Sequence, residues 1–556
     1  MSQQRKFITT TNIPYAISIF CFALLDILFL LGIFPNPLRG ALLGSRVILP
    51  SVLMMSLASA VLIPGVAQKL SLGISRILRT GNTPEQEIGG RNPLERIVFI
   101  HLLITIFLLF LNTKLLYQLS DLSRSSDDTV DFILVTAFHP LSLAFWTAYK
   151  PPLLPLLIRL LGYTSEGIMQ HQLLDDVANV QLFISAAAWT VFVLSILVHL
   201  KKRLSKLAAF TIILFFSVTL DISMWDRLTL SESLSISFFV LWLACFSAWL
   251  YLLYQPDRSR ILQILFLVCL TLITFLYANA RDTNIYFAVM MTGLLTLWLV
   301  VSKQFFLIKR KLFLFGLVIV AAIFLSHSYV YNISNRWHPV IMDLMTDRLA
   351  DNPDAVAFFE QQGMPPANDL VAKYSYPDFH SFLDARRFRV IKDDGTDEFN
   401  TWFANQSKRT YITYLLRNPI TTFTEPFRDW KLMLLENTYQ YREPNGPLSQ
   451  RIQWLTSLLY PHHPVILVGL SLLLLGILIV NLRNRQIVAP LWMIVFGLLL
   501  TVPAMMILVW VGGSLEIPRH AFQISVQFRL ALWLGLIASL EMISVESLMV
   551  KKKFAK

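Results

Sequence analysis

Cysteine is scarce in this sequence, and the few cysteines stand where they cannot link distant segments. Only Cys21, Cys245 and Cys269 occur in 556 residues, and each lies inside an apolar run. Three such residues do not make a disulfide framework and are most simply small buried side chains. Zinc-type spacing is also missing among the histidines His139, His171, His338, His462 and His463. We therefore predict no metal site, while an assisting divalent cation stays open.

A basic stripe of the kind that binds nucleic acid is absent as well. The chain has 47 Lys and Arg against 35 Asp and Glu, a formal charge of +12, but the basic residues are dispersed between apolar runs. Nucleic-acid-binding surfaces gather basic and aromatic side chains together. This distribution excludes nucleic acid as a partner and is typical of the loops of a membrane protein.

What the sequence has in abundance is apolar runs of about 20 residues, roughly the length that spans a hydrocarbon core. Hydrophobic residues make up 55% of the chain, and the mean hydropathy is +0.59. We predict an all-α polytopic membrane protein with about twelve transmembrane helices. The predicted spans are Ile13–Phe34, Ile48–Val66, Ile97–Tyr117, Val180–Leu197, Leu207–Ile222, Leu234–Tyr254, Ile261–Tyr277, Ile285–Val301, Leu312–Ser328, Pro464–Ile479, Ile487–Val511 and Ala521–Ile543.

Lys and Arg are concentrated in alternate connecting segments between the predicted spans. Every second short segment is basic, beginning with Arg5 and Lys6 and ending with Lys551–Lys553. Cytoplasmic loops carry the excess of Lys and Arg, so both termini are expected in the cytoplasm. The other set of segments would face outward: the loop at 118–179, the turns Asp226–Ser231, Arg281–Asn284 and Glu516–His520, and the long polar segment.

This pattern divides the chain into four parts. Residues 1–95 form an N-terminal extension with two spans and a basic segment, and residues 96–326 form a transmembrane core that includes the loop 118–179. Residues 327–462 are polar, not repetitive, and are predicted to form a small α or α+β cap outside the membrane. Residues 463–556 hold the last three spans. No internal repeat of the transporter kind is found.

The loop 118–179 has the best candidates for chemistry. It opens with three carboxylates, Asp127, Asp128 and Asp131, and returns to the membrane through Lys150, which precedes two prolines. One well-placed carboxylate can act as a general base. A lysine at the interface can meet a lipid phosphate, and the prolines restrict its approach. A solvated acidic loop and a lysine that snorkels to ordinary headgroups are the plain alternatives.

Polar residues at the other outward turns could complete a site. Glu232 begins a span and could orient a base or bind a sugar hydroxyl, although a helix start with a favourable dipole explains it too. Arg281 and Asp282 form a polar turn that could line a cleft. Arg529 lies deep in the last span, where an arginine is costly unless it faces a cavity or an anion such as phosphate. Asp26 in the first span is a similar anomaly without an assigned partner.

Several of these motifs, in this order, resemble those of GT-C glycosyltransferases. They are Asp128-Thr129-Val130-Asp131-Phe132, Lys150-Pro151-Pro152-Leu153, Ser231-Glu232-Ser233-Leu234-Ser235, Arg281-Asp282-Thr283-Asn284, Gly363-Met364-Pro365 and Arg519-His520. The family includes the protein O-mannosyltransferases and the lipid A aminoarabinose transferase, which use polyprenyl-phosphate sugars. The resemblance runs from about residue 97 to the C-terminus, and the first two spans look like an addition.

The resemblance implies an inverting transfer from a polyprenyl-phosphate-linked sugar to a lipid, glycan or protein acceptor on the outer face of a bacterial inner membrane. Asp128 would activate the acceptor, with Asp127 a neighbouring alternative and Asp131 close by. The donor phosphate would be held among Lys150, Arg281, Arg519, His520 and Arg529. The family often has a tyrosine soon after the acid, where this chain has Phe132.

Three other functions stay open from the sequence. A transporter or flippase would show paired, broken spans with charges at mid-membrane. A non-catalytic envelope assembly factor would use the long segment to dock a partner. An oligosaccharide polymerase or ligase would depend on arginine and histidine rather than aspartate.

Overall fold

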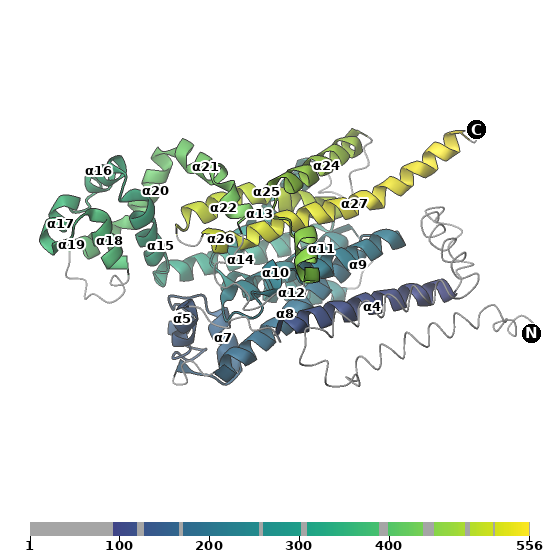
Figure 1. The fold of residues 1–556 in the computed structure, drawn as a ribbon, viewed down its shortest axis with the longest axis horizontal. Helices are drawn as coiled ribbons and strands as arrows, with labels where there is room; N and C mark the ends of the chain where they lie inside the picture. The colour runs from purple at the N-terminus through teal and green to yellow at the C-terminus, as the bar shows by residue number, and fades with distance from the viewer. Residues whose placement is uncertain are drawn as a thin grey trace, which may run out of the picture.

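The computed structural model describes residues 93–118, 127–165, 171–254, 260–301, 308–387, 398–436, 450–483, 490–514 and 517–554, in which helices are joined by short turns and no β-strand occurs (Figure 1). The helices of the main bundle are α4 (Pro93–Gln118), α8 (His171–Leu197), α9 (Arg203–Ser217), α11 (Ser231–Tyr254), α12 (Arg260–Ala280), α13 (Asn284–Val301), α14 (Arg310–Ile333), α24 (Pro464–Arg483), α25 (Pro490–Val511) and α27 (Phe522–Phe554).

Seven of the described helices are long and apolar enough to cross a membrane: α8, α11, α12, α13, α14, α25 and α27. Shorter apolar stretches occur in α4 (Phe99–Leu115) and α24 (Pro464–Gly476). The predicted span Leu207–Ile222 ends early, because the chain leaves α9 after Ser217 and forms the short α10 (Leu220–Ser223). The first two predicted spans, with Cys21 and Asp26, lie outside the described residues.

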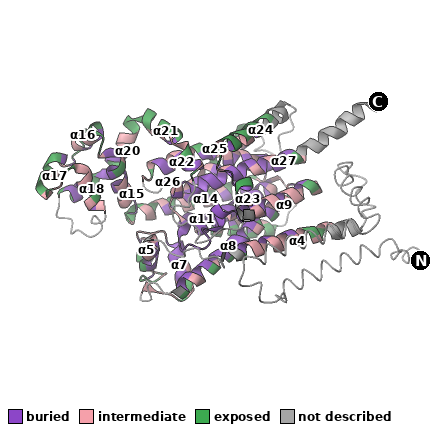
Figure 2. Cartoon of the chain, in the orientation of Figure 1, coloured by how far each residue is buried: buried purple, intermediate pink, exposed green. Residues whose placement is uncertain are grey.

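Helix α11 is the centre of the bundle, as the run of buried residues in Figure 2 shows. It is apolar on all sides, and it packs against α8, α12 and α25. A helix that is apolar all round is stable only where neighbours cover every face. Helix α12 differs, because its side chains Ile261, Leu265, Val268 and Leu272 point outward and are 54–70% exposed. An apolar stripe of this kind is suited to lipid.

The predicted outward segments meet at one end of the bundle. Asp128 in the first loop contacts Arg519, just before α27, and Thr129 donates a hydrogen bond to the carbonyl of Thr229. At the opposite end, the backbone amides of Lys201 and Lys202 donate to the carboxylate of Glu541. Members of the predicted outward set therefore lie together at one end of the described bundle. The Asp226–Ser231 turn belongs to this end too, and its side chains are buried within the protein.

A helical cap follows α14 and projects from the end of the bundle that carries the first loop (Figure 1). Its elements are α15 (Trp337–Leu344), the π-helix η4 (Met345–Leu349), α16 (Pro353–Gln361), α17 (Ala367–Tyr374), α18 (Phe379–Arg387), α19 (Glu398–Trp402), the π-helix η5 (Phe403–Ser407), α20 (Lys408–Arg417) and α21 (Pro419–Arg428). The cap has its own apolar core, which includes Trp337, Phe359, Phe382 and Phe403. Its described residues contain helices only, so the α form of the prediction fits them.

The cap is smaller than the predicted segment 327–462. Helices α22 (Trp430–Leu434) and α23 (Gln450–Leu459) return to the bundle, where Leu434 and Leu459 join the main core. The first residues of the segment, including His327, belong to the end of α14.

We expect cysteines placed at the two ends to be labelled from opposite sides of the membrane. Gln361→Cys lies on the exposed surface of α16 in the cap, and Lys201→Cys lies in the turn between α8 and α9. An impermeant maleimide added to intact cells should label the first and reach the second only after permeabilisation. Labelling of both from the same side would contradict the arrangement of the spans.

Candidate functional site

Two carboxylates of the first loop share one lysine. Helix α5 (Asp127–Val135) has Asp128 and Asp131 on successive turns at its N-terminal end, where the helix dipole favours negative charge. The Nζ atom of Lys150 lies 3.1 Å from Asp128 Oδ1 and 3.2 Å from Asp131 Oδ2. It also lies 5.5 Å from the centre of the Phe132 ring. Lys150, which precedes two prolines in the sequence, therefore forms ion pairs with two acids of the same loop.

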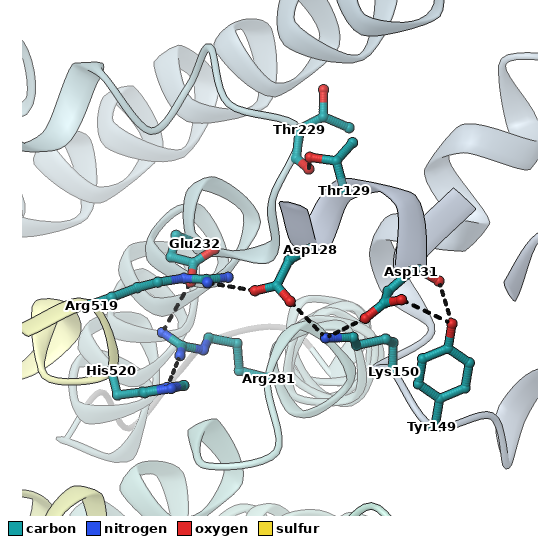
Figure 3. A network of polar contacts seen from close by, with 10 residues as sticks. All are labelled: Asp128, Thr129, Asp131, Tyr149, Lys150, Thr229, Glu232, Arg281, Arg519 and His520. Atoms are coloured by element: carbon teal, nitrogen blue, oxygen red, sulfur yellow. Dashed lines mark hydrogen bonds and ion pairs between the residues drawn. The ribbon is translucent and has the colours of Figure 1, made fainter. Parts of the chain in front are cut away.

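Arg519 joins this loop to the centre of the bundle (Figure 3). Its Nη1 atom lies 2.5 Å from Asp128 Oδ2, and its Nε atom lies 2.5 Å from Glu232 Oε1. Arg519 comes from the short α26 (Ile517–His520), and Glu232 from the first turn of α11. One guanidinium thus bridges two carboxylates from different elements with charge-assisted hydrogen bonds.

Glu232 is a buried carboxylate, and only one of its two oxygens has a partner among the described residues. Its side chain has no exposed surface, and Arg281 Nη1 lies 3.8 Å from the same oxygen that receives Arg519. The other oxygen, Oε2, is buried and has no hydrogen-bond partner among the described residues. Buried polar atoms are normally paired, so an unpaired acceptor beside two cations is suited to a ligand that donates a hydrogen bond.

His520 is held neutral by its surroundings. Arg281 Nη2 lies 2.7 Å from His520 Nδ1. Burial, then the positive charges of Arg281 and Arg519, lower the pKa of His520 to about 3. A guanidinium can only donate, so Nδ1 is the acceptor and the ring hydrogen is on Nε2.

Asp128 is firmly ionised. Burial opposes its charge, but the nearby Lys150 and then Arg519 outweigh burial and lower the pKa of this carboxyl group to about 2. Its side chain is still 34% exposed, so a ligand can approach it. The cluster therefore contains three carboxylates and three cations, and one of these carboxylates, Asp128, is accessible to a ligand.

Tyr149 also belongs to this cluster and was missed by the sequence reasoning. Its hydroxyl donates to the backbone carbonyl of Asp131 at 3.2 Å and lies 3.5 Å from Asp131 Oδ1. Burial, followed by the charge of Asp131, raises the pKa of Tyr149 to about 12. Its position directly before Lys150 was the one available signal.

Asp282 points away from the cluster. Its carboxylate lies 2.9 Å from Arg336 Nη1 and 3.4 Å from His327 Nε2. Arg336 is buried at the base of the cap and also donates to the carbonyls of Ala148 and Trp146. These contacts tie the turn of Arg281 to the loop that contains Lys150. Nothing in the sequence singled out Arg336, because long polar segments contain many arginines.

Arg529 lies apart from the cluster, and its guanidinium is already occupied. It donates to the carbonyl of Pro461 and to Ser525 Oγ, at 2.7 Å and 2.5 Å, and it lies 4.1 Å from the centre of the Tyr460 ring. It is 1% exposed. A deep arginine needs a partner, and here the protein itself supplies one, so Arg529 does not belong to the cluster around Asp128.

A second deep charge, Lys114, was missed although it carries the same sequence signal as Arg529. Its Nζ atom lies 2.6 Å from Asp226 Oδ2, and Ser233 Oγ donates to Asp226 Oδ1 at 2.8 Å. The pair is buried and holds the turn that leads into Glu232. Lys114 therefore supports the site from within the bundle.

The side chain of Asp127 lies outside the described residues, and the contacts described above are those of Asp128. Within the part of the chain that the structure describes, no group of three or more His, Cys, Asp or Glu side chains could hold a metal ion.

No protein-family model matches the chain, and no curated protein matches it either.

We expect Arg519→Met to destabilise the fold strongly, because it leaves Glu232 buried with only the more distant Arg281 nearby. Loss of one partner of a buried ion pair costs on the order of 3–5 kcal/mol. Thermal unfolding in detergent should show a clear drop in the midpoint. The double variant Arg519→Met with Glu232→Gln removes the orphaned charge and should recover much of the loss. If it recovers nothing, the two groups are not energetically coupled.

We expect the stability of the protein to fall as the pH drops below about 6.5, partly through His520. In the unfolded chain a histidine takes up a proton near pH 6.5, whereas in the fold the pKa of His520 is about 3. Between these values the unfolded state binds the extra proton, so acid favours unfolding. His520→Gln keeps an acceptor for Arg281 but does not titrate. The midpoint of thermal unfolding of this variant, measured from pH 7 to pH 4, should fall less steeply than that of the wild type. An equal slope would contradict the neutral state of His520.

Proposed function

We propose that this chain is a membrane glycosyltransferase that transfers a sugar from a polyprenyl-phosphate-linked donor to an acceptor hydroxyl, with inversion. The observation that carries the proposal is the Asp128 carboxylate, which lies at the end of the spanning bundle between Lys150 and Arg519. The GT-C-like motifs supplied the hypothesis, and the convergence of their polar residues in space supports it.

Asp128 is the proposed general base. The acceptor oxygen attacks the anomeric carbon of the sugar while the bond from that carbon to the phosphate oxygen breaks. The acceptor proton passes to Asp128, and the electron pair of the broken bond leaves with the lipid phosphate. A carboxylate within hydrogen-bond reach of the attacking hydroxyl is sufficient for this role.

A pKa of about 2 makes Asp128 a poor base in the unliganded site. The same cations that lower this pKa are suited to a phosphate, and a guanidinium binds phosphate more readily than an ammonium group does. When a donor phosphate takes Lys150 and Arg519 as partners, Asp128 loses part of its positive surroundings and its pKa rises. Donor binding would therefore prepare the base for proton transfer.

Glu232 and Arg281 are suited to the sugar. The unpaired Oε2 atom of Glu232 can accept a hydrogen bond from a sugar hydroxyl, and Arg281 adds a donor nearby. Asp131 and Tyr149 keep Lys150 in place from the other side. Asp282, held by Arg336, would orient Arg281 rather than touch the substrate.

The donor must arrive through the lipid if the site faces outward. The alternation of basic segments favours both termini in the cytoplasm and the site on the outer face of a bacterial inner membrane. Nucleotide-activated sugars are absent from that compartment, so a polyprenyl-phosphate carrier is the fitting donor. The acceptor would be a lipid, a glycan or a protein.

An oligosaccharide polymerase or ligase is the second candidate, because His520 stands beside Arg281 and Arg519. Such a mechanism would use histidine as the base. The hydrogen bond from Arg281 occupies Nδ1, and the hydrogen on Nε2 makes that atom a donor. This geometry favours Asp128 over His520 as the base.

We expect Asp128→Asn to reduce sugar transfer by at least about 100-fold while expression and thermal stability stay near the wild type. Loss of a general base typically costs on the order of 100- to 10,000-fold. Transfer from a polyprenyl-phosphate sugar should be measured in membranes at saturating donor, so that turnover and not binding is compared. Asp369→Asn, which changes an exposed carboxylate of α17, is the matched control and should remain active.

The same assay separates the two candidates. His520→Gln should lose less turnover than Asp128→Asn. If the order is reversed, the histidine mechanism is favoured, and if Asp128→Asn retains full activity, the proposed base is wrong.

A further inference from the structure

A stripe of exposed apolar side chains follows α20 and α21 at the base of the cap, and α21 is green over much of its length in Figure 2. The members of the stripe and their exposed fractions are Ile412 (48%), Leu416 (75%), Ile420 (78%), Phe423 (56%) and Phe427 (43%). Residues three and four apart share a face of a helix. An apolar face of this length on a soluble surface would be a liability, so it is expected to have a partner.

Contacts with the spanning helix α25 show where the stripe lies relative to the membrane. Trp510 Nε1 donates to Glu425 Oε2 of α21 at 3.1 Å, and the hydroxyl of Tyr411 in α20 donates to the carbonyl of Val511 at 3.0 Å. Helix α25 ends at Val511. Tryptophan at the end of a span is typical of the level of the lipid headgroups. The stripe therefore lies where the bundle leaves the hydrocarbon.

Positive charge accompanies the stripe. Arg409, Arg417 and Arg428 are exposed beside it. The acids of α21 and of the residue after it are fewer than these basic residues: Glu425 accepts a hydrogen bond from Trp510, and Asp429 lies 3.7 Å from Arg428. Apolar side chains flanked by arginines are the pattern of helices that bind anionic membrane surfaces.

A hollow lies at the cap end of the stripe. It has a volume of about 360 Å³ and is lined by Trp337, Asn405, Lys408, Arg409 and Ile412, among others. The Nζ atom of Lys408 contacts the side chain of Asn332 and lies 5.6 Å from the centre of the Trp337 ring. Ile412 belongs both to the hollow and to the stripe, so an apolar chain on the stripe would bring its headgroup to Lys408 and Arg409.

We propose that α20 and α21 form an interfacial membrane-binding face, which inserts the stripe among lipid acyl chains and binds the phosphate of an anionic phospholipid at Lys408 and Arg409. The occupant is lipid rather than a second protein because a bilayer must surround the end of α25, against which α21 packs. This inference does not depend on the proposed glycosyltransferase activity.

The test uses the full chain with its native cysteines replaced and one fluorophore attached at Phe423→Cys, reconstituted in vesicles of phosphatidylglycerol and phosphatidylcholine. Lipids brominated on the acyl chain should quench this fluorophore, and aqueous iodide should not. A matched label at Gln361→Cys, on the exposed surface of α16, should show the opposite behaviour. If the label at position 423 is quenched by iodide as readily as that at 361, or is shielded from both quenchers, the membrane contact is wrong.

The charge preference is tested with the same label at position 423. Quenching by brominated lipid should be several-fold stronger when the brominated species is phosphatidylglycerol than when it is phosphatidylcholine. The double variant Lys408→Gln with Arg409→Gln should abolish that preference, whereas Lys373→Gln, which removes a basic residue of α17, should keep it. Equal quenching by both lipids in the wild type would overturn the anionic-lipid site.

Discussion

The guanidinium of Arg519 is the interaction on which the arrangement of the polar cluster depends. It reaches Asp128 in the first loop and Glu232 at the start of the central helix, each at 2.5 Å. An ionised Glu232 in the interior needs such a partner, and Asp128 gains through Arg519 a direct link to the central helix. Three elements far apart in the sequence are thereby brought to one point at the end of the bundle.

The bundle and the cap contribute to this point by different means. The central helix α11 fixes Glu232 through apolar packing on all sides. The cap acts through Arg336, which holds the turn beside Arg281 and the carbonyls before Lys150. Lys150 and Arg519 therefore reach Asp128 from two separate segments, one held by the cap and the other by the central helix.

Much of the cluster could be predicted from the sequence, because its members stand at the ends of long apolar runs. Asp128, Lys150, Glu232, Arg281, Arg519 and His520 were all identified in this way, and the structure brings them together. The spacing of residues in the sequence could not show which charged side chains find their partners inside the protein. Arg529 is hydrogen-bonded to a carbonyl and a serine, and Lys114 forms an ion pair with Asp226. The contribution of Arg336 was also invisible, since it depends on how the cap folds back. Helix positions followed from the apolar runs, but α9 ended early where the chain turns at Val218.

The contrast between α11 and α12 has a consequence for the response of the site to its surroundings. Helix α11 is enclosed by protein, whereas α12 presents a row of large aliphatic side chains outward and ends next to Arg281. A bilayer whose thickness does not match a lipid-facing helix acts on that helix directly. Because α12 ends next to Arg281 and α11 begins beside Glu232, we expect bilayer thickness to affect the spacing between these two side chains.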